Sequence, residues 1–98
     1  MRVILSRRAV ADIVWITEQI AEHNRSAAAR TEQHIEDAIN RMGVFPEIGH
    51  EKKTLGARVR IVRVRRRKYT IYYRVNDDAV VISHIRDGRR APPTSGDI

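Results

Sequence analysis

Residues 58–90 constrain the fold of this chain more than any other stretch. They read RVRIVRVRRRKYTIYYRVNDDAVVISHIRDGRR. Val, Ile and Tyr fill the apolar positions, and such β-branched and aromatic side chains favour strands over helices. The same stretch carries most of the positive charge of the chain. We therefore expect a sheet in the last third of the protein, with the functional surface on or beside it.

The first strand of this stretch has two apolar phases. Val59 and Ile61 alternate in one phase, whereas Val62 and Val64 alternate in the other. Successive side chains of a strand point to opposite faces of the sheet. The pattern therefore predicts a bulge or a strong bend between Ile61 and Val62, or a strand that is partly buried on both faces.

Two turns and two further strands complete the stretch. The run Arg65-Arg66-Arg67-Lys68 is too crowded with like charge for a packed strand and predicts an exposed turn. The next strand places Tyr69 and Tyr73 on one face, where we expect both in the core. Asn76-Asp77-Asp78 predicts a hairpin turn, and residues 80–85 return as the last strand.

The N-terminal segment predicts a strand followed by a helix. Residues 1–5 (MRVIL) are apolar and β-branched, and Ser6 is a good N-cap for a helix from Arg7 to about His23. Trp15 and Ile16 fall beside or outside its apolar stripe, so Trp15 is expected either at a partner interface or at the core edge. The stripe expected to face the core is Val10, Ile13, Val14, Thr17, Ile20 and Ala21.

A second helix is predicted after residues 23–25. Ser26 is its expected cap, Gly43 its expected C′ residue, and Pro46 prevents continuation into the loop of residues 45–56. The predicted buried stripe of this helix is Ala28, Thr31, Ile35, Ala38, Ile39 and Met42.

The order of these elements predicts an α+β fold of the type β-α-α-β-β-β. It consists of an N-terminal strand, a two-helix antiparallel hairpin and a three-stranded antiparallel meander, with the helices across one face of the sheet. We expect one domain over residues 1–90. Residues 91–98 (APPTSGDI) have little to bury and predict a flexible tail.

Composition excludes several kinds of site. The chain of 98 residues has no cysteine, which excludes disulfides and thiolate metal sites. His23, His34 and His50 lack the spacing of a helical metal site, and no Gly-rich phosphate loop is present, so we expect neither metal nor cofactor. No long apolar run or signal-peptide pattern occurs, which predicts a soluble cytoplasmic protein without a membrane partner.

The net charge of +7 is concentrated in the second half of the chain. Residues 1–50 hold six Lys and Arg against seven Asp and Glu, whereas residues 51–98 hold thirteen against five. Such asymmetry indicates a surface for a polyanion or an acidic partner, although a merely solvated basic face is the alternative. The residues predicted to bind the target or nucleic acid are Arg58, Arg60, Arg63, Arg65, Arg66, Arg67, Lys68, Arg86, Arg89 and Arg90.

The chain contains several short motifs. Each is a weak indication of a family by itself, but their order and spacing together are fairly specific. The motifs are AVADIVWI at residues 9–16, Pro46-x-x-Gly49, Tyr69-x-Ile71-x-Tyr73-Arg74-Val75, Val80-x-Ile82 and Arg86-Asp87-Gly88-Arg89-Arg90. Over residues 2–90 the chain thus resembles the RelE/ParE family of small bacterial toxins from type II toxin–antitoxin systems, and its ParE-like branch most. The resemblance implies a cognate antitoxin, ParD-like or of another type, whose C-terminal segment wraps the toxin. It further implies a role in plasmid stabilisation, and either DNA gyrase or messenger RNA on the ribosome as the target.

A RelE-like nuclease would need a base, an acid and cations around the RNA phosphate. The resemblance places a Tyr or His for this purpose near the C-terminus, but no tyrosine follows Tyr73. Asp87 stands where many ParE-like chains have histidine, which leaves His84 with Arg86 as the catalytic candidates. His84 has an alternative interpretation as a partly buried structural histidine. The set of nuclease residues is therefore incomplete.

A ParE-like toxin need not break a bond, because it would bind gyrase and block the DNA cycle of that enzyme. The basic residues suit contact with DNA or with an acidic enzyme surface. We therefore expect a gyrase-binding toxin rather than an enzyme, with Trp15, Tyr72 and Arg74 as antitoxin contacts. The alternatives are a RelE-like ribosome-dependent mRNA endoribonuclease and a degenerate, non-toxic family member.

Overall fold

The computed structural model describes residues 1–88 and 90–94 of the chain. Two helices and five strands follow one another in the order β-α-α-β-β-β-β. Their bounds are β1 Arg2–Leu5, α1 Arg7–Ala21, α2 Arg25–Val44, β2 His50–Lys52, β3 Ala57–Val64, β4 Arg67–Val75 and β5 Ala79–Asp87. The α+β fold class predicted from the sequence is confirmed.

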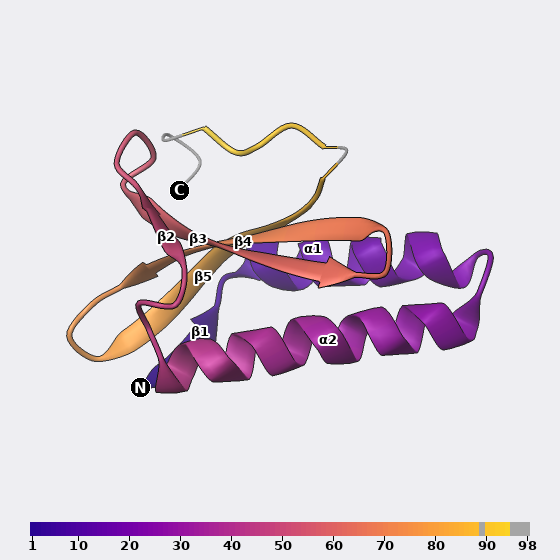
Figure 1. Ribbon diagram of the computed structural model, residues 1–98, viewed down its shortest axis with the longest axis horizontal. Helices are drawn as coiled ribbons and strands as arrows, with labels where there is room; N and C mark the ends of the chain where they lie inside the picture. Colours follow the sequence, from indigo (N-terminus) through magenta and orange to yellow (C-terminus); the bar gives the residue numbers. More distant parts are fainter. Residues whose placement is uncertain (89, 95–98) are drawn as a thin grey trace.

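All five strands form one sheet in the order β1-β5-β4-β3-β2. Strands β2 to β5 pair antiparallel with their neighbours, whereas β1 runs parallel to β5, with Arg2 opposite Ala79. The first strand of the chain therefore lies beside the last. Figure 1 shows α1 and α2 as an antiparallel pair on one side of the strands, with residues 90–94 returning on the other side.

The core lies between the helices and the sheet. From the sheet it receives Tyr69, Ile71, Tyr73, Val80, Ile82 and Ile85, and from the helices Ile16, Ile35, Ile39 and Met42. Tyr69 and Tyr73 are fully buried there, as predicted. Among the described residues, no helix is both long and apolar enough to cross a membrane.

The predicted stripe of α1 was right only in part. Ile13 and Ile20 pack against the core as predicted, but Val10 and Val14 are 49% and 47% exposed. Ala9, Asp12 and Ile16, which lie outside the predicted stripe, are buried instead. Ser6 caps the helix as predicted, since its side-chain oxygen accepts a hydrogen bond from the Ala9 amide at 3.0 Å.

Every residue of the predicted stripe of α2 is buried, but both predicted ends of this helix were wrong. Asn24 rather than Ser26 is the N-cap and accepts from the Ala27 amide. The helix continues through Gly43 to Val44. A Cβ at position 43 would lie 2.9 Å from the Met1 carbonyl oxygen, so this glycine allows the helix to pass close to the N-terminal segment.

The segment predicted as a loop over residues 45–56 contains the edge strand β2. In β3 the pairing with β4 continues without interruption, so no bulge separates Ile61 from Val62. Val59 and Val62 are both buried on opposite faces, which is the second of the two predicted alternatives. The irregularity instead lies between β4 and β5, at Tyr72 and Tyr73.

The two predicted turns differ in their outcome. Asn76 closes the β4–β5 turn as expected, because its side-chain oxygen accepts from the amides of Asp78 and Ala79. The turn after β3 is shorter than predicted: only Arg65 and Arg66 lie in it, and Arg67 already pairs with Val64.

Candidate functional site

The β3–β4 turn forms a cationic tip at one end of the molecule. Arg65 and Arg66 are its two loop residues, and both are exposed together with Arg67 and Lys68. Arg63 stands opposite Lys68 across the strand pair and is exposed as well. We call these five residues, Arg63 and 65–68, the hairpin tip. The hairpin tip unites half of the basic residues that the sequence predicted as a binding surface.

Backbone geometry at the hairpin tip is unusual for arginine. Arg65 has a φ of 57° and is the one non-glycine residue with a positive φ among those described. A two-residue hairpin loop needs a positive φ at its first central position, because that twist matches the flanking strands. Glycine meets this need without steric cost, whereas an L side chain is disfavoured there.

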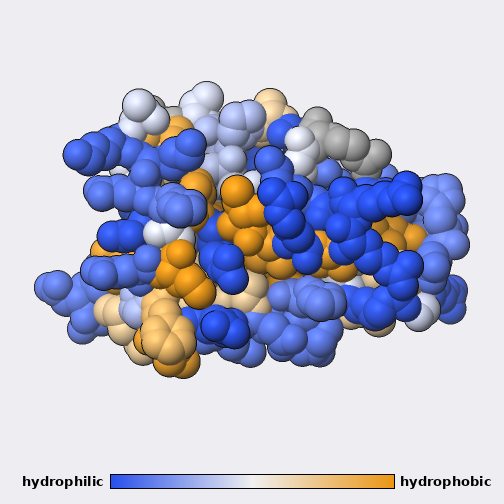
Figure 2. All heavy atoms as spheres, viewed as in Figure 1, coloured by the Kyte–Doolittle hydropathy of each residue, from blue (hydrophilic) through white to orange (hydrophobic). Residues whose placement is uncertain are grey.

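A pocket of about 310 Å³ lies between the hairpin tip and the end of the helical pair. Its apolar lining comes from Ile20, Ala27 and Val64, with Thr31 beside them, and its cationic lining from Arg30, Arg65, Arg66 and Arg67. In Figure 2, hydrophilic side chains cover most of the right-hand end of the molecule, where these two turns meet. We call this cavity the tip pocket.

The other predicted basic residues of β3 are placed differently. Arg58 and Arg60 stand opposite Tyr73 and Ile71, so they lie on the helix-covered face and are half-buried. Arg58 donates to the Gly49 carbonyl oxygen at 3.1 Å, and Arg60 donates to the Ile61 carbonyl oxygen at 3.2 Å. These two arginines therefore lie apart from the hairpin tip, farther along the strand pair.

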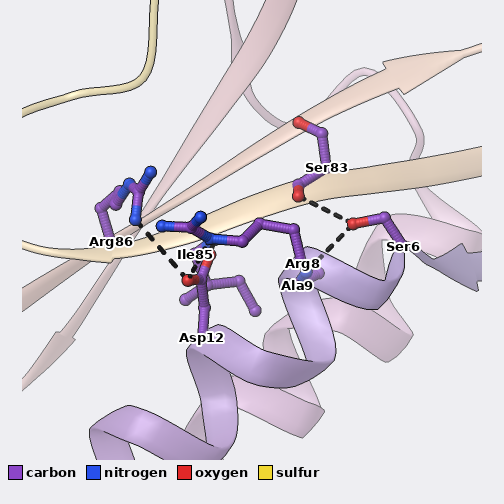
Figure 3. A network of polar contacts seen from close by, with 7 residues as sticks. All are labelled: Ser6, Arg8, Ala9, Asp12, Ser83, Ile85 and Arg86. Atoms are coloured by element: carbon purple, nitrogen blue, oxygen red, sulfur yellow. Dashed lines mark hydrogen bonds and ion pairs between the residues drawn. The ribbon is translucent and has the colours of Figure 1, made fainter. Parts of the chain in front are cut away.

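Arg86 belongs to a buried network centred on Asp12 (Figure 3). The Asp12 carboxylate accepts from the Ile85 amide at 2.9 Å and from Arg8 Nε at 3.0 Å, and it lies 3.6 Å from Arg86 Nη1. Strand β1 pairs with β5 only as far as Ile82. Beyond that point Asp12 occupies the edge of β5 and supplies the acceptor that a further strand would have supplied.

Sequence reasoning missed Asp12 as a key residue. Asp12 is 2% exposed, and Arg86, predicted as a target contact, is 9% exposed. A signal was present, because Asp12 is spaced three and four residues from Ala9 and Ile16. An acidic residue on the buried stripe of a helix needs buried donors, and these come from β5.

The second predicted basic cluster extends over Arg86, Arg89 and Arg90. Arg90 lies with its guanidinium carbon 4.6 Å from the centroid of the Trp15 ring, a cation–π arrangement. Trp15 is 39% exposed on α1. Arg89 lies outside the described residues. The chain after β5 is thus tied to the first helix.

The outer face of the sheet, opposite the helices, carries His84 and Tyr72 as cross-strand neighbours. They are 5% and 7% exposed. Burial raises the pKa of the Tyr72 phenol above its ordinary value, and the positive charge of Arg86 offsets part of this shift. Pro92 and Pro93 line a pocket of about 400 Å³ together with Tyr72 and other side chains of this face.

The tail residues 91–94 include one buried residue, Pro93. Residues 95–98 lie outside the described part of the chain. The flexibility of the tail and the domain boundary at residue 90 remain predictions.

The predicted antitoxin contacts do not form one cluster. Trp15 lies on α1, Tyr72 is buried in the outer face, and Arg74 is exposed near the β2–β3 turn. Arg74 donates from Nε to the Gly56 carbonyl oxygen at 2.8 Å. Contact of these three residues with an antitoxin remains a prediction.

Exposed apolar side chains gather at the end of the molecule far from the hairpin tip. Val44 is 70% exposed and Phe45 57% exposed where α2 ends. Together with Met1, Ile48 and Val75 they line a broad depression of about 690 Å³. The lower left of Figure 2 shows apolar residues over this end of α2.

Acidic and histidine side chains show no comparable gathering. Within residues 1–88 and 90–94, no three of them form a group that could hold a metal ion.

Comparison with known proteins gives consistent matches. Residues 3–92 match the family model described as ParE toxin of type II toxin-antitoxin system, parDE. Toxin ParE3 of Caulobacter vibrioides is 30% identical over 89 residues, which cover 90% of this chain and 87% of that protein. The solved structure "Chromosomal ParDE TA system from P. aeruginosa" matches with a TM-score of 0.72 at 19% identity, covering 89% of this chain and 95% of that one.

Proposed function

Because the chain belongs to the ParE toxin family of type II toxin–antitoxin systems, we propose that it inhibits DNA gyrase and that a cognate antitoxin neutralises it. The observation that carries the proposal is the hairpin tip, an exposed group of five cations at one end of the molecule. A cationic projection of this kind is attracted to an acidic enzyme surface or to the DNA bound there.

The proposed mechanism is binding, not bond cleavage. The toxin acts in the cytoplasm and holds gyrase in a state that cannot complete its DNA cycle. Release from the antitoxin starts this action, which accounts for a role in plasmid stabilisation: a cell that loses the antitoxin gene keeps the toxin. The positions of His84 and Arg86 support a mechanism without catalysis, because the His84 side chain is buried and the Arg86 side chain lies against Asp12.

The test is supercoiling of relaxed plasmid by purified gyrase, with and without the toxin freed from its antitoxin. We expect inhibition or an accumulation of cleaved DNA, and reversal when the antitoxin is added. Normal supercoiling in the presence of a folded toxin that still stops growth would rule out gyrase as the target.

One observation supports a second candidate, a ribosome-dependent mRNA endoribonuclease. Tyr72, His84 and Arg86 lie on one face of the β4–β5 pair, and these residue types supply acid–base and cationic groups in RNA cleavage. His84→Ala separates the candidates. A nuclease would lose RNA cleavage by a factor of about 100 or more, whereas a gyrase inhibitor that remains folded would keep its effect. A family member without toxicity would show neither activity.

A further inference from the structure

We propose that the tip pocket binds an acidic protein segment of the target enzyme, anchored by one aliphatic side chain, and that DNA phosphate is not its ligand. This inference rests on the proposed function and specifies the part of the target that the toxin contacts. It assigns the first contact to the hairpin tip and to the adjoining end of the helical pair.

The lining of the tip pocket defines the ligand. Ile20, Ala27 and Val64 present apolar groups, and the arginines stand around them. An aliphatic side chain removes this apolar surface from water, while neighbouring carboxylates meet the guanidinium groups. A phosphate backbone would satisfy the arginines but would leave the apolar lining uncovered. Among the described residues, those that line the pocket include no aromatic ring on which an unstacked base would lie.

The arginines of the pocket fall into two pairs. Arg30 donates to the Ser26 hydroxyl at 2.9 Å, and Arg67 lies 3.4 Å from the Asp87 carboxylate, so both are held in place. Arg65 and Arg66 make no ion pair with any residue that the structure describes. The first pair shapes the pocket, and the second pair supplies charge for an acidic partner.

The positive φ of Arg65 is an independent indication of function. Glycine would fit this turn without strain, yet the chain carries an arginine there. The turn needs the positive φ but does not need an arginine to adopt it, so the strained arginine points to a role of its side chain. Arg65 is one of the residues that line the tip pocket, which gives that role a location.

The position of the pocket favours the target over the antitoxin as the source of the segment. An antitoxin that stores the toxin must hold it tightly, and stable association relies on a buried apolar centre. The exposed apolar side chains Val44 and Phe45 lie at the opposite end of α2, which at 20 residues spans about 30 Å. None of the predicted antitoxin contacts Trp15, Tyr72 and Arg74 lines the tip pocket either, so we assign the hairpin tip to a charged, rapidly formed contact with the target.

The decisive variant is Arg65→Gly, because it removes the side chain while improving the fit of the turn. Its matched control is Arg7→Ala, which removes one exposed positive charge from the first turn of α1. Both variants and the wild-type toxin are compared in three assays: inhibition of gyrase supercoiling, direct binding to gyrase without DNA, and binding to the cognate antitoxin.

We expect Arg65→Gly to weaken gyrase inhibition, and binding to gyrase in the absence of DNA, by about tenfold. This is the effect of losing one hydrogen bond between a charged side chain and its partner. The affinity for the antitoxin should change less than about twofold, and Arg7→Ala should match the wild type. A loss of antitoxin binding with unchanged gyrase binding would overturn the proposal. So would a loss that appears only with a duplex DNA fragment as the binding partner.

A separate probe keeps the inference distinct from the proposed function. Two labelled peptides carry the same four glutamates around a central leucine or a central serine. The leucine peptide should bind the wild-type toxin at least about fivefold more tightly, and Arg65→Gly should lose most of this binding. If the toxin does not inhibit gyrase but the leucine peptide binds more tightly than the serine peptide, then gyrase is not the target, and the assignment of the pocket to an acidic segment with an aliphatic anchor stands. Equal binding of the two peptides would overturn the pocket assignment itself.

Discussion

Asp12 joins a helix, a strand edge and two arginines through one carboxylate. Replacing it with alanine removes the acceptor of the Ile85 amide and the ion pair with Arg86. We expect Asp12→Ala to lower the free energy of unfolding by about 3 kcal/mol. Asp12→Asn keeps an oxygen for the amide and should lose only about half as much. Urea unfolding measures both, and equal losses would show that the backbone contact contributes nothing.

Tyr72 gives the stability of the toxin a dependence on alkaline pH. Burial raises the pKa of its phenol above 10.0, so the folded chain holds this proton more firmly than the unfolded chain does. The resulting stability is fully present below pH 10 and is lost as the pH rises through the pKa of the folded state.

Tyr72→Phe tests this linkage because phenylalanine keeps the ring and cannot ionise. The urea midpoint of the wild type should fall more steeply between about pH 9 and pH 11 than that of the variant. Parallel curves for the two proteins would mean that Tyr72 ionises equally in the folded and unfolded chains.

At the scale of elements, the loop before β2 depends on Tyr73. Its hydroxyl accepts from the Gly49 amide at 2.8 Å and donates to the Pro46 carbonyl oxygen at 3.0 Å. A Cβ at position 49 would lie 2.5 Å from the Val59 carbonyl oxygen and 2.6 Å from this hydroxyl. The glycine of the Pro46-x-x-Gly49 motif is thus explained by the close approach of two neighbours.

Gly49→Ala should therefore destabilise the fold by about 2 kcal/mol through overpacking. In a Tyr73→Phe background the same change should cost less, since the clashing hydroxyl has been removed while the Val59 oxygen and the Tyr73 ring carbon at 2.9 Å remain. The double-mutant cycle in urea measures this coupling. Strict additivity would indicate that the Tyr73 hydroxyl does not contribute to excluding a side chain at position 49.

The elements differ in how well their sequence predicts them. Residues of α2 repeat at helical spacing without a competing pattern, and its buried stripe was predicted in full. In α1 the exposed Val10 and Val14 are more apolar than the buried Ala9 and Asp12, so hydrophobicity alone placed the edge of the buried stripe wrongly, although Ile13 and Ile20 pack against the core as predicted. Strand β2 has the sequence HEK with all three residues exposed, and it therefore lacks any apolar signal.

The sequence predicted which basic residues belong to the candidate site, but it did not predict which other side chains surround them. The charge run of residues 65–68 predicted an exposed turn, and all four residues are exposed, although the turn itself contains only Arg65 and Arg66. Its apolar neighbours Ile20 and Ala27 come from the helical pair, and only the tertiary fold brings them to the turn. The same holds for Arg86, since its burial depends on where β1 ends beside β5.

At the scale of the whole molecule, the net charge of +7 and its concentration in the second half favour electrostatic steering. The association rate with gyrase should fall by about tenfold between roughly 0.05 M and 0.5 M salt, while the dissociation rate changes little. Stopped-flow or surface binding kinetics separates the two rates. If salt changed mainly the dissociation rate, the charged residues would act within the packed interface and not by long-range attraction before contact.

The parallel pairing of β1 with β5 has a consequence for how the protein folds during translation. Arg2 and its partner Ala79 are 77 positions apart, so the sheet cannot close until nearly the whole chain has been translated. At about 5–20 residues per second, roughly 4–15 s separate the synthesis of these two strands. For most of that interval residues 57–75, which form the cationic hairpin, have not yet been synthesised, and no complete sheet can cover the helices. The complete fold is therefore available only when translation is nearly finished.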